Sequence, residues 1–268
     1  MTPKPQPPEL SLVMPCYNEE ECLHQTAGEL LAAFAAGDIA LQLVLVDNGS
    51  RDRTGALVDA LIAAGQPVTK VVVEVNQGYG NGVLEGLRHC EAPLVGTVMA
   101  DGQVAAEDIV GIFRVACAAA VPTLAKVRRR FREDSWRRRL VSVIYNLGMQ
   151  AAFGWLGSID LNGSPKIMPR AAMLAMELQS KDWFLDPEIM IKSKYLGLRV
   201  CERNVKGLMR LGGKSNVRYS TCLQFLKNIA RYRFGGELRR WKCTVRQSSY
   251  WQQRRQAPAP APQRSVQP

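Results

Sequence analysis

Polar and glycine-rich segments follow four apolar runs of this 268-residue chain, each at the point where the run ends. They are Pro15-Cys16-Tyr17-Asn18-Glu19, Asp47-Asn48-Gly49-Ser50, Asn76-Gln77-Gly78-Tyr79-Gly80 and Asp101-Gly102-Gln103. Carboxylate and amide oxygens suit a hard cation such as Mg²⁺, and glycine lets a backbone approach a ligand closely. One such loop alone is more simply a polar turn. The four together, two of them with an aspartate directly after the apolar run, indicate a ligand-binding edge.

Basic residues supply a second kind of chemistry, because a guanidinium binds phosphate oxygens bidentately. The chain has 35 Lys and Arg against 24 Asp and Glu, a net charge of +11. Residues 126–139 contain eight basic and two acidic residues, and residues 227–255 contain nine basic and one acidic. The rest of the chain is slightly acidic. This distribution predicts an anionic partner, which is nucleic acid, a membrane surface or a phosphorylated substrate.

Four tryptophans lie within or beside the two basic segments: Trp136, Trp155, Trp241 and Trp251. Tryptophan next to arginine is typical of a membrane interface, and a solvated charged face is the simpler alternative. The 20 residues between positions 139 and 160 carry no charge and are long enough to span a bilayer. However, a polar residue recurs every four positions in the series Arg138, Ser142, Asn146 and Gln150. The pattern therefore favours an amphipathic, membrane-docking helix over a transmembrane one.

The elements that must position these residues alternate between strand and helix. Apolar runs predict strands at 10–14, 41–46, 69–75 and 93–100, and helical spacing predicts helices at 19–34, 54–64, 82–89 and 106–119. Such alternation indicates an α/β fold with a mostly parallel sheet flanked by helices. Ligands bind beyond the carboxyl ends of the strands in such sheets, so the four polar segments should share one edge.

Several classes of protein are disfavoured. The first strand is not followed by G-x-G-x-x-G and no Walker lysine pattern occurs, which argues against a dinucleotide dehydrogenase and a P-loop enzyme. Only His24 and His89 are available for a Ser-His-Asp triad, and both fall in helical patterns. The seven cysteines include no C-x-x-C pair, so a zinc site or a disulfide framework is not expected. The Pro-rich start lacks an apolar signal region, and we expect a cytoplasmic protein.

The ordered motifs resemble those of a known family. SLVMPCYNEEE, VDNGSRDRT, NQGYGNG and ADGQ are similar to motifs of the inverting glycosyltransferases of family 2, which have a GT-A (Rossmann-like) fold. RRRLVSVIYN, DLNGSPKI, DWFLDPEIMIKSKYLGLRVCE and RLGGKSNVR look like the polyprenol-phosphate mannose synthase and polyprenyl-phosphate glycosyltransferase branch. The resemblance covers roughly residues 10–232. It implies a Pro-rich arm at 1–9, a single catalytic domain at 10–235, and a basic tail at 236–268 that is disordered at its end.

The resemblance implies transfer of a hexose, mannose or glucose, from a GDP- or UDP-sugar to a polyprenyl phosphate with inversion. The residues implied for nucleotide-sugar binding are Pro15, Tyr17, Asn18, Glu19, Asp47, Asn76, Gly78, Gly80 and Asp101. Asn48 stands where the family usually has a second aspartate. Asp101 and Gln103 are implied ligands of Mg²⁺ or Mn²⁺, but Met99 replaces the first aspartate of the metal motif, so metal affinity should be lower.

The acceptor side is implied to be cationic. A phosphate monoester reaches the site already ionised, so its transfer needs cations rather than a general base. The implied acceptor-phosphate contacts are Arg128, Arg138, Ser142 and Arg210, although Arg129 or Arg130 could take the place of Arg128. The catalytic set is Asp101, Arg138, Arg210 and Glu188, with Glu188 facing the sugar and Asp186 capping a helix that has Pro187 at its first position. Asp160 is implied on the acceptor side.

Three alternatives compete with this interpretation. The first is a family 2 transferase that acts on a soluble or glycan hydroxyl, and the second is a catalytically impaired nucleotide-sugar binder, suggested by Met99. The third is a nucleic-acid-binding protein, which the slightly acidic bulk and the lack of a known motif disfavour. We expect a peripheral protein at the inner face of an anionic membrane. The sequence does not indicate an oligomeric state.

Overall fold

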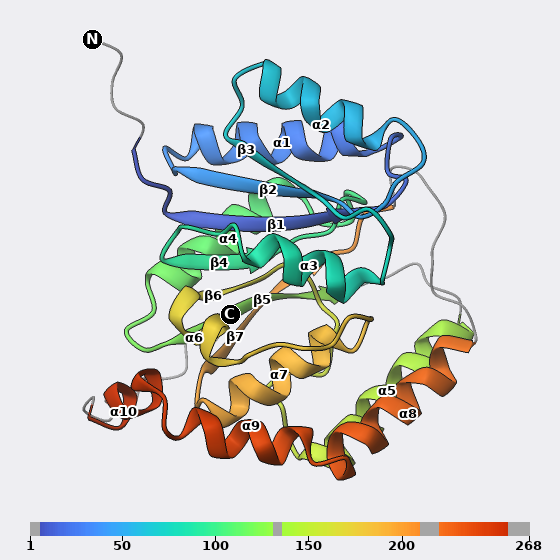
Figure 1. The fold of residues 1–268 in the computed structure, drawn as a ribbon, viewed down its shortest axis with the longest axis vertical. Coiled ribbons are helices and arrows are strands. Elements are labelled where there is room, and N and C mark those ends of the chain that lie inside the picture. Colours follow the sequence, from blue (N-terminus) through green and yellow to red (C-terminus); the bar gives the residue numbers. More distant parts are fainter. Residues whose placement is uncertain (1–5, 131–135, 210–219, 257–268) are drawn as a thin grey trace.

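The computed structural model describes residues 6–130, 136–209 and 220–256, without side chains at 130, 136–142, 220–223, 225–226 and 255–256. In this part of the chain a seven-stranded sheet has the order β3-β2-β1-β4-β6-β5-β7 (Figure 1). The strands are β1 (Leu10–Cys16), β2 (Leu41–Asp47), β3 (Val68–Val72), β4 (Leu94–Thr97), β5 (Thr123–Arg130), β6 (Lys166–Pro169) and β7 (Arg199–Lys206). The described strands are parallel except β6, which runs against both of its neighbours.

Helices cover both faces of the sheet (Figure 1). They are α1 (Leu23–Ala36), α2 (Thr54–Ala63), α3 (Tyr79–Leu87), α4 (Ala106–Cys117), α5 (Trp136–Phe153), α6 (Arg170–Ala175), α7 (Leu185–Tyr195), α8 (Ser220–Phe234), α9 (Glu237–Val245) and α10 (Ser249–Gln256). The four predicted strands and the four predicted helices of the first half are all present, and the predicted α/β fold with a mostly parallel sheet is confirmed.

Two hydrophobic cores lie on opposite faces of the sheet because successive strand side chains alternate between the faces. On one face, Leu12 and Met14 of β1 pack in a core with Phe34 of α1. On the other face, Val13 joins a core that contains Val83 of α3 and continues through α7 to α9. The central strands are therefore apolar on both faces, which explains why their sequences read as unbroken hydrophobic runs.

Two helices, α9 and α10, lie between residues 237 and 256 and pack on the rest of the fold. Trp241 of α9 is 5% exposed and donates its Nε1–H to the carbonyl of Ala175 at 3.0 Å. The guanidinium of Arg254 in α10 donates from Nε to the carbonyl of Leu196 at 2.8 Å. Trp241 therefore serves the hydrophobic core, and the sequence-based expectation that it faces a membrane is wrong. The last twelve residues, 257–268, lie outside the described part, so their expected disorder stays a prediction.

The uncharged segment forms α5, which lies beside α8 (Figure 1). Tyr145 and Met149 face the core, whereas Val143, Ile144 and Leu147 are more than half exposed. Among the described residues, we find no helix with the length and apolar character that a membrane crossing requires.

Candidate active site

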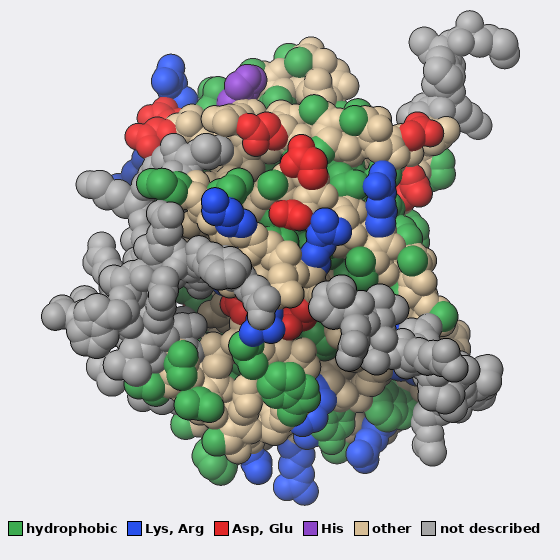
Figure 2. Space-filling model, turned by 180° about the vertical axis from the view of Figure 1, so that it is seen from behind, with side chains coloured by type: hydrophobic (Ala, Val, Ile, Leu, Met, Phe, Trp, Pro, Cys, Tyr) green, Lys and Arg blue, Asp and Glu red, His purple; other side chains and the backbone are tan. Residues whose placement is uncertain are grey.

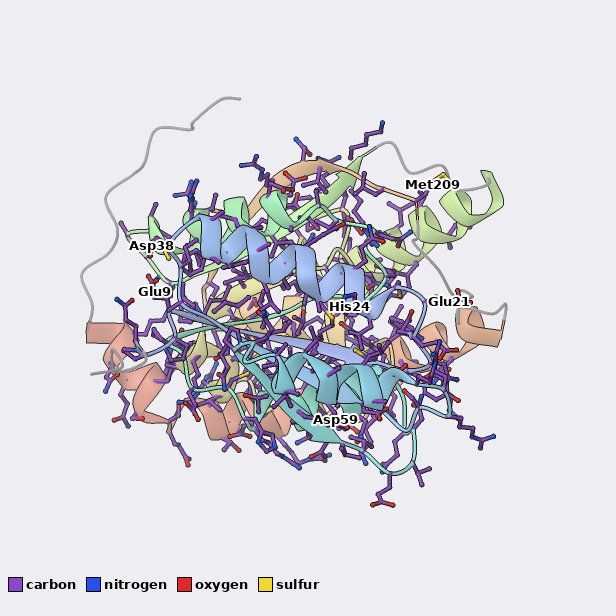
Figure 3. All side chains as sticks on the ribbon, turned by 90° about the horizontal axis from the view of Figure 1, so that it is seen from above. Glu9, Glu21, His24, Asp38, Asp59 and Met209 are labelled. Atoms are coloured by element: carbon purple, nitrogen blue, oxygen red, sulfur yellow. The ribbon has the colours of Figure 1, made fainter. Side chains whose placement is uncertain are left out.

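The loops that follow β1 and β2 are joined at the carboxyl edge of the sheet. The backbone N–H of Asn18 donates to the Ser50 hydroxyl at 3.1 Å, and the Asn18 side-chain oxygen accepts the N–H of Arg51 at 2.8 Å. The N–H of Glu19 donates to the hydroxyl of Thr54 at 2.9 Å. The polar segments after β1 and β2 are therefore held together by hydrogen bonds, as expected for the ends of two adjacent parallel strands. Figure 3 shows this edge from above: Glu21 lies there with Met209, while Glu9 and Asp38 lie at the opposite end.

Asp47 and Asn48 anchor this edge from the end of β2. One carboxylate oxygen of Asp47 accepts the N–H of Ser50 at 3.0 Å, and a side chain at Gly55 would place its Cβ 2.6 Å from the other oxygen. Asn48 is buried, and its amide donates to the carbonyl of Gly78 at 3.1 Å. A carboxylate cannot donate that hydrogen bond. Asn48, which stands where the family usually has an aspartate, therefore tethers the loop of residues 76–80, called here the glycine loop.

The glycines of the loop before α3 are required by protein packing. A Cβ on Gly78 would lie 2.4 Å from the carbonyl oxygen of Lys181, and a Cβ on Gly80 would lie 2.3 Å from that of Ser180. Gly78 also has a φ of +116°, which side chains disfavour. Asn76, exposed, accepts the N–H of Gly78 at 2.8 Å. From the sequence we expected these glycines to let the backbone approach a nucleotide. In the structure they instead allow the loop to pack against residues 180–182.

Asp101 lies just beyond β4 and is nearly buried. Its Oδ1 accepts the N–H of Gln103 at 3.2 Å, and the carbonyl of Gln103 accepts the N–H of Leu208 beyond β7 at 3.0 Å. Met99 is half-buried at the position of the missing aspartate. Within the described residues no group of three or more His, Cys, Asp or Glu side chains could hold a metal ion. The donor set fits a cation bound by one carboxylate and completed by diphosphate oxygens, as is usual for Mg²⁺, rather than a site made by protein alone.

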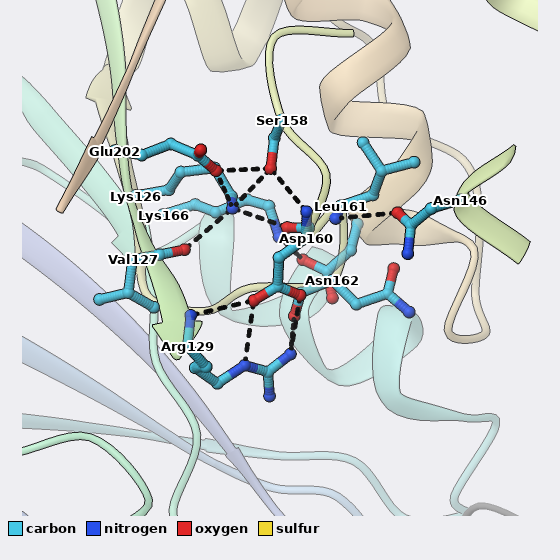
Figure 4. Close-up of polar contacts among 11 residues, drawn as sticks. Lys126, Val127, Arg129, Asn146, Ser158, Asp160, Leu161, Asn162, Lys166 and Glu202 are labelled. Carbon is cyan, nitrogen blue, oxygen red and sulfur yellow. Dashed lines mark hydrogen bonds and ion pairs between the residues drawn. The ribbon is translucent and has the colours of Figure 1, made fainter. Parts of the chain in front are cut away.

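Arg129 and Asp160 form a nearly buried ion pair at the tip of β5 (Figure 4). The guanidinium donates from Nε at 3.3 Å and from Nη2 at 3.2 Å to the two carboxylate oxygens, and the Arg129 N–H donates to Oδ2 at 3.2 Å. Burial alone would raise the pKa of the Asp160 carboxyl, but the charge and hydrogen bonds of Arg129 hold it well below its usual value. Asp160 is therefore ionised at neutral pH, and Arg129 is engaged by protein rather than open to a phosphate.

Lys126 is buried behind this pair and holds the loop that carries Asp160 (Figure 4). Its ammonium donates to the carbonyl of Asp160 at 2.6 Å, to the hydroxyl of Ser158 at 3.2 Å and to Glu202 at 3.0 Å. Burial and repulsion from Lys166 lower the pKa of Lys126 to about 8, while Asp160 and Glu202 act against this. Lys126 thus positions the Asp160 loop.

Two further buried pairs occupy the carboxylates of the FLDPE motif. Asp186 lies in the first turn of α7, after Phe184, and accepts Nζ of Lys166 at 2.5 Å. The predicted capping role of Asp186 is wrong, because Phe184 is the N-cap residue of α7 and Asp186 lies inside the helix. Glu188 is 1% exposed and pairs with Lys192 at 2.6 Å.

Glu188 has no open oxygen for a sugar. Oε1 accepts the Lys192 ammonium and the N–H of Gln179 at 3.2 Å, and Oε2 accepts the N–H of Ser180 at 2.9 Å. These bonds hold residues 179–180, against which the glycine loop packs. The geometry speaks against the expectation that Glu188 faces the sugar, and we assign it a structural role.

The acceptor-phosphate contacts fall largely outside the described residues. The side chains of Arg138 and Ser142 and the whole of Arg210 lie there, so their roles stay predictions. Arg128 on β5 is half-buried, and no acidic side chain in the described ranges pairs with it. Asn146, the next member of the predicted polar series, accepts the N–H of Leu161 at 3.4 Å, which places the middle of α5 against the Asp160 loop.

The remaining predicted residues, Pro15 and Tyr17, are half-buried at the exit of β1. The structure thus gathers the predicted strand-end segments at one edge. Sequence reasoning missed two contributors, the buried lysines Lys126 and Lys166. A signal existed for the two lysines, since each is a lone cation inside an apolar strand pattern, TLAKV and PKIM. A buried lysine must be paired, so each predicts a carboxylate partner.

Comparison with known proteins now bears on the identity of the chain. The sequence profile of "Glycosyl transferase family 2" matches residues 11–172, more than half of the chain. The chain belongs to glycosyl transferase family 2. This family 2 member is a glycosyltransferase, so the resemblance to the family 2 glycosyltransferases predicted from the sequence is confirmed.

Two curated relatives of the family 2 chain carry the same name, undecaprenyl-phosphate 4-deoxy-4-formamido-L-arabinose transferase. The protein of Sodalis glossinidius is 33% identical over 147 residues, which are 54% of this chain and 44% of that protein. The protein of Shewanella sediminis is 36% identical over 140 residues, 51% of this chain and 41% of that protein. The chain therefore matches less than half the length of these relatives.

Solved structures of Mycobacterium tuberculosis glucosyl-3-phosphoglycerate synthase share the fold of the family 2 chain. The complex with phosphoglyceric acid superposes with a TM-score of 0.65 at 16% identity, covering 84% of this chain and 80% of the other. The complex with Mg²⁺ and uridine-diphosphate gives 0.65 at 18% identity, covering 85% and 80%. At these identities the likeness establishes the GT-A-like fold alone.

Proposed function

We propose that this chain transfers a hexose, mannose or glucose, from a GDP- or UDP-sugar to a polyprenyl phosphate with inversion. The proposal rests on one observation: three carboxylates at the candidate site are each paired with a cationic side chain of the protein. Asp186 and Glu188 are each paired with a buried lysine, and Asp160 is paired with Arg129. A carboxylate held in this way is a poor proton acceptor.

Transfer to a hydroxyl requires a group that removes the hydroxyl proton, whereas a phosphate acceptor arrives as an anion. The paired carboxylates therefore favour the phosphate acceptor over the soluble or glycan hydroxyl. The relatives from two bacteria, named for transfer to undecaprenyl phosphate, support the same choice.

On the donor side, we propose that Pro15, Tyr17, Asn18, Glu19, Asp47 and Asp101 line the nucleotide-sugar site. Asp101 and Gln103 would hold Mg²⁺ or Mn²⁺ together with the donor diphosphate. The bound cation would supply charge neutralisation for the departing diphosphate. Structural neighbours that bind UDP with Mg²⁺ or Mn²⁺ support this placement.

On the acceptor side, we propose that Arg128, Arg138, Ser142 and Arg210 grip the lipid phosphate. The exposed apolar side of α5 would bring this part of the molecule to a membrane, with Val143, Ile144 and Leu147 at 54%, 57% and 60% exposure. Arg239, Arg240 and Arg246 are exposed on or directly after α9. Figure 1 shows α9 at the lower end of the molecule, and Figure 2 shows Lys and Arg side chains projecting at that end when the molecule is seen from behind. An anionic membrane attracts such a surface, so we propose peripheral attachment to the inner face of the membrane.

The test is radiolabelled sugar transfer with undecaprenyl phosphate in anionic vesicles, after a thermal-shift screen of GDP- and UDP-sugars with Mg²⁺ or Mn²⁺. We expect label in an organic-extractable, acid-labile product. Product formed only with aqueous acceptors would instead establish the hydroxyl transferase. Stabilisation by a nucleotide sugar without any transfer would establish an impaired binder.

A further inference from the structure

Asp182 joins two parts of the molecule that are far apart in the chain, the glycine loop and α8. Its Oδ2 accepts the side-chain amides of Gln224 and Asn228, both on α8, at 2.8 Å and 2.7 Å. Its Oδ1 accepts the N–H of Phe184 at 2.9 Å, which fixes the orientation of the carboxylate. Asn228 is buried, and hydrogen bonds to a charged group are stronger than those between neutral groups. One carboxylate therefore holds α8 to the segment that leads into α7.

The backbone at Asp182 packs against the glycine loop. The carbonyl of the preceding residue, Lys181, accepts the N–H of Asn81 at 2.9 Å, directly after the loop. A Cβ on Gly80 would lie 2.7 Å from the carbonyl oxygen of Asp182 itself. The loop and residues 180–182 are therefore in direct contact, and neither can shift without the other.

The glycine loop is fixed in turn to the proposed donor site. The side-chain amide of Asn48 donates to the carbonyl of Gly78 at 3.1 Å, and the backbone N–H of Asn48 donates to the carbonyl of Cys16 at 2.8 Å. Asn48 directly follows Asp47, and Cys16 directly follows Pro15, two of the residues that we place in the nucleotide-sugar site. Asp182 is thus connected to the donor site through one short series of backbone contacts.

α8 connects Asp182 to the proposed acceptor side as well, because α8 lies beside α5 (Figure 1). Arg233 of α8 donates its Nε–H to the carbonyl of Ala152 in α5 at 3.1 Å. The rings of Tyr232 and Phe153 meet edge to face, with centroids 6.2 Å apart. α5 has the exposed apolar side that we assign to the membrane. The position of this helix over the site therefore depends on where α8 is held.

We propose that Asp182 is a positioning residue for acceptor binding: it sets the place of α8, and through α8 that of α5, relative to the donor site. This inference rests on the proposed function and deepens it, since it assigns the relative placement of the two substrates to one carboxylate. Asp182 itself contacts neither substrate in this role. Transfer requires two reacting groups to be aligned, so a displacement of α5 weakens capture of the acceptor and leaves the donor site intact.

The test is the variant Asn228→Asp, which keeps the size of the side chain and places a second carboxylate against Asp182. Like charges at hydrogen-bond distance repel, so α8 is pushed away from residue 182. We expect the KM for undecaprenyl phosphate in vesicles to rise about tenfold. The calorimetric Kd of the GDP- or UDP-sugar that most stabilises the wild type, measured with Mg²⁺, should stay unchanged. A smaller folded fraction alone would lower kcat and leave both constants as they are.

The double variant Asp182→Asn with Asn228→Asp reverses the direction of the hydrogen bond, because the new amide donates to the new carboxylate. We expect it to restore the KM for undecaprenyl phosphate, which a general loss of stability would not do. Gln224→Glu applies the same repulsion from an exposed position of α8 and should raise this KM by a smaller factor, and it decides the test if Asn228→Asp does not fold. Gln66→Glu, in the exposed turn between α2 and β3, is the matched control for added charge and should behave like the wild type.

An unchanged KM for undecaprenyl phosphate in the folded α8 variants would overturn the positioning role while the wild type still transfers sugar. A double variant as impaired as Asn228→Asp alone would overturn it too, as would an equal loss of donor affinity. A wild type that transfers no sugar to undecaprenyl phosphate would overturn the proposed function and this inference together.

Discussion

The variant Glu188→Gln distinguishes a structural from a chemical role for the carboxylate in the first turn of α7. The wild-type side chain is 1% exposed, pairs with Lys192 at 2.6 Å, and accepts backbone N–H groups from Gln179 and Ser180. Glutamine keeps the shape and one acceptor oxygen, but it removes the charge that compensates the buried ammonium. Breaking a buried pair at one partner costs about 3 kcal/mol of unfolding free energy.

For a domain of this size, that loss corresponds to a melting temperature lower by about 6–12 °C. Because Glu188 contacts no open site, transfer measured well below the melting temperature should stay within about threefold of wild type. A carboxylate that worked as a general base would behave in the opposite way, since its loss costs about 10²–10⁴-fold in kcat.

The assay is differential scanning calorimetry together with lipid-linked transfer at a temperature where both proteins are folded. The matched control is the double variant Glu188→Gln with Lys192→Met, which removes both charges and keeps a side-chain oxygen that accepts the backbone N–H groups. We expect it to recover most of the lost stability, because no buried charge remains unpaired. An unchanged melting temperature with kcat more than a hundredfold lower would refute the structural assignment.

Two other predictions concern the edge of the sheet. Arg129→Met should lower the unfolding free energy by about 3 kcal/mol at neutral pH. The pKa of Asp160 is held low in the folded state, so the stabilisation is present above the unfolded pKa of about 4 and is lost as the pH falls through the folded value. In urea unfolding from pH 7 to pH 3, the difference in unfolding free energy between wild type and Arg129→Met should become smaller below about pH 4. A difference that stays constant would contradict the pairing. Met99→Asp should tighten Mn²⁺ binding about tenfold in the presence of UDP by supplying a hard oxygen ligand, and unchanged calorimetric affinity would place position 99 outside the coordination sphere.

The first half of the fold could be predicted because its local signals agree with one another. The runs that became β1 and β2 are apolar on both faces, and the polar residues after them, such as Asn18 and Asp47, mark the strand ends. A parallel sheet brings those ends to one edge whatever the details of the loops. The order β4-β6-β5 could not be predicted, since it depends on the direction and the place in the sheet of a four-residue strand, neither of which the sequence states.

The site was predicted less completely, because residue types reveal chemistry but not partners. Glu188 and Asp186 have the side chains of catalytic acids, yet lysines on α7 and β6 neutralise them in the fold. The basic tail suggested a membrane face, but a single buried hydrogen bond assigns Trp241 to the core. The contacts of Asp186 and Trp241 join elements whose relative placement the sequence does not state. Glu188 and Lys192 lie four residues apart on one helix, so that pairing could have been predicted from their spacing.

The reversed strand β6 has a consequence for how this architecture tolerates change. Ala125 of β5 pairs with Ile167 of β6, so the polypeptide leaves the sheet after β5 and re-enters it at the adjacent position. The 35 intervening residues, 131–165, include α5 and form an excursion with neighbouring endpoints. The entropy of closing such an excursion depends only weakly on its length. Insertions or deletions in the exposed part of this excursion should leave the pairing of β1, β2 and β4 undisturbed. Tyr145, Met149 and Asp160 tie the rest of it to the core and to Arg129, so only its solvent-facing part is free to vary.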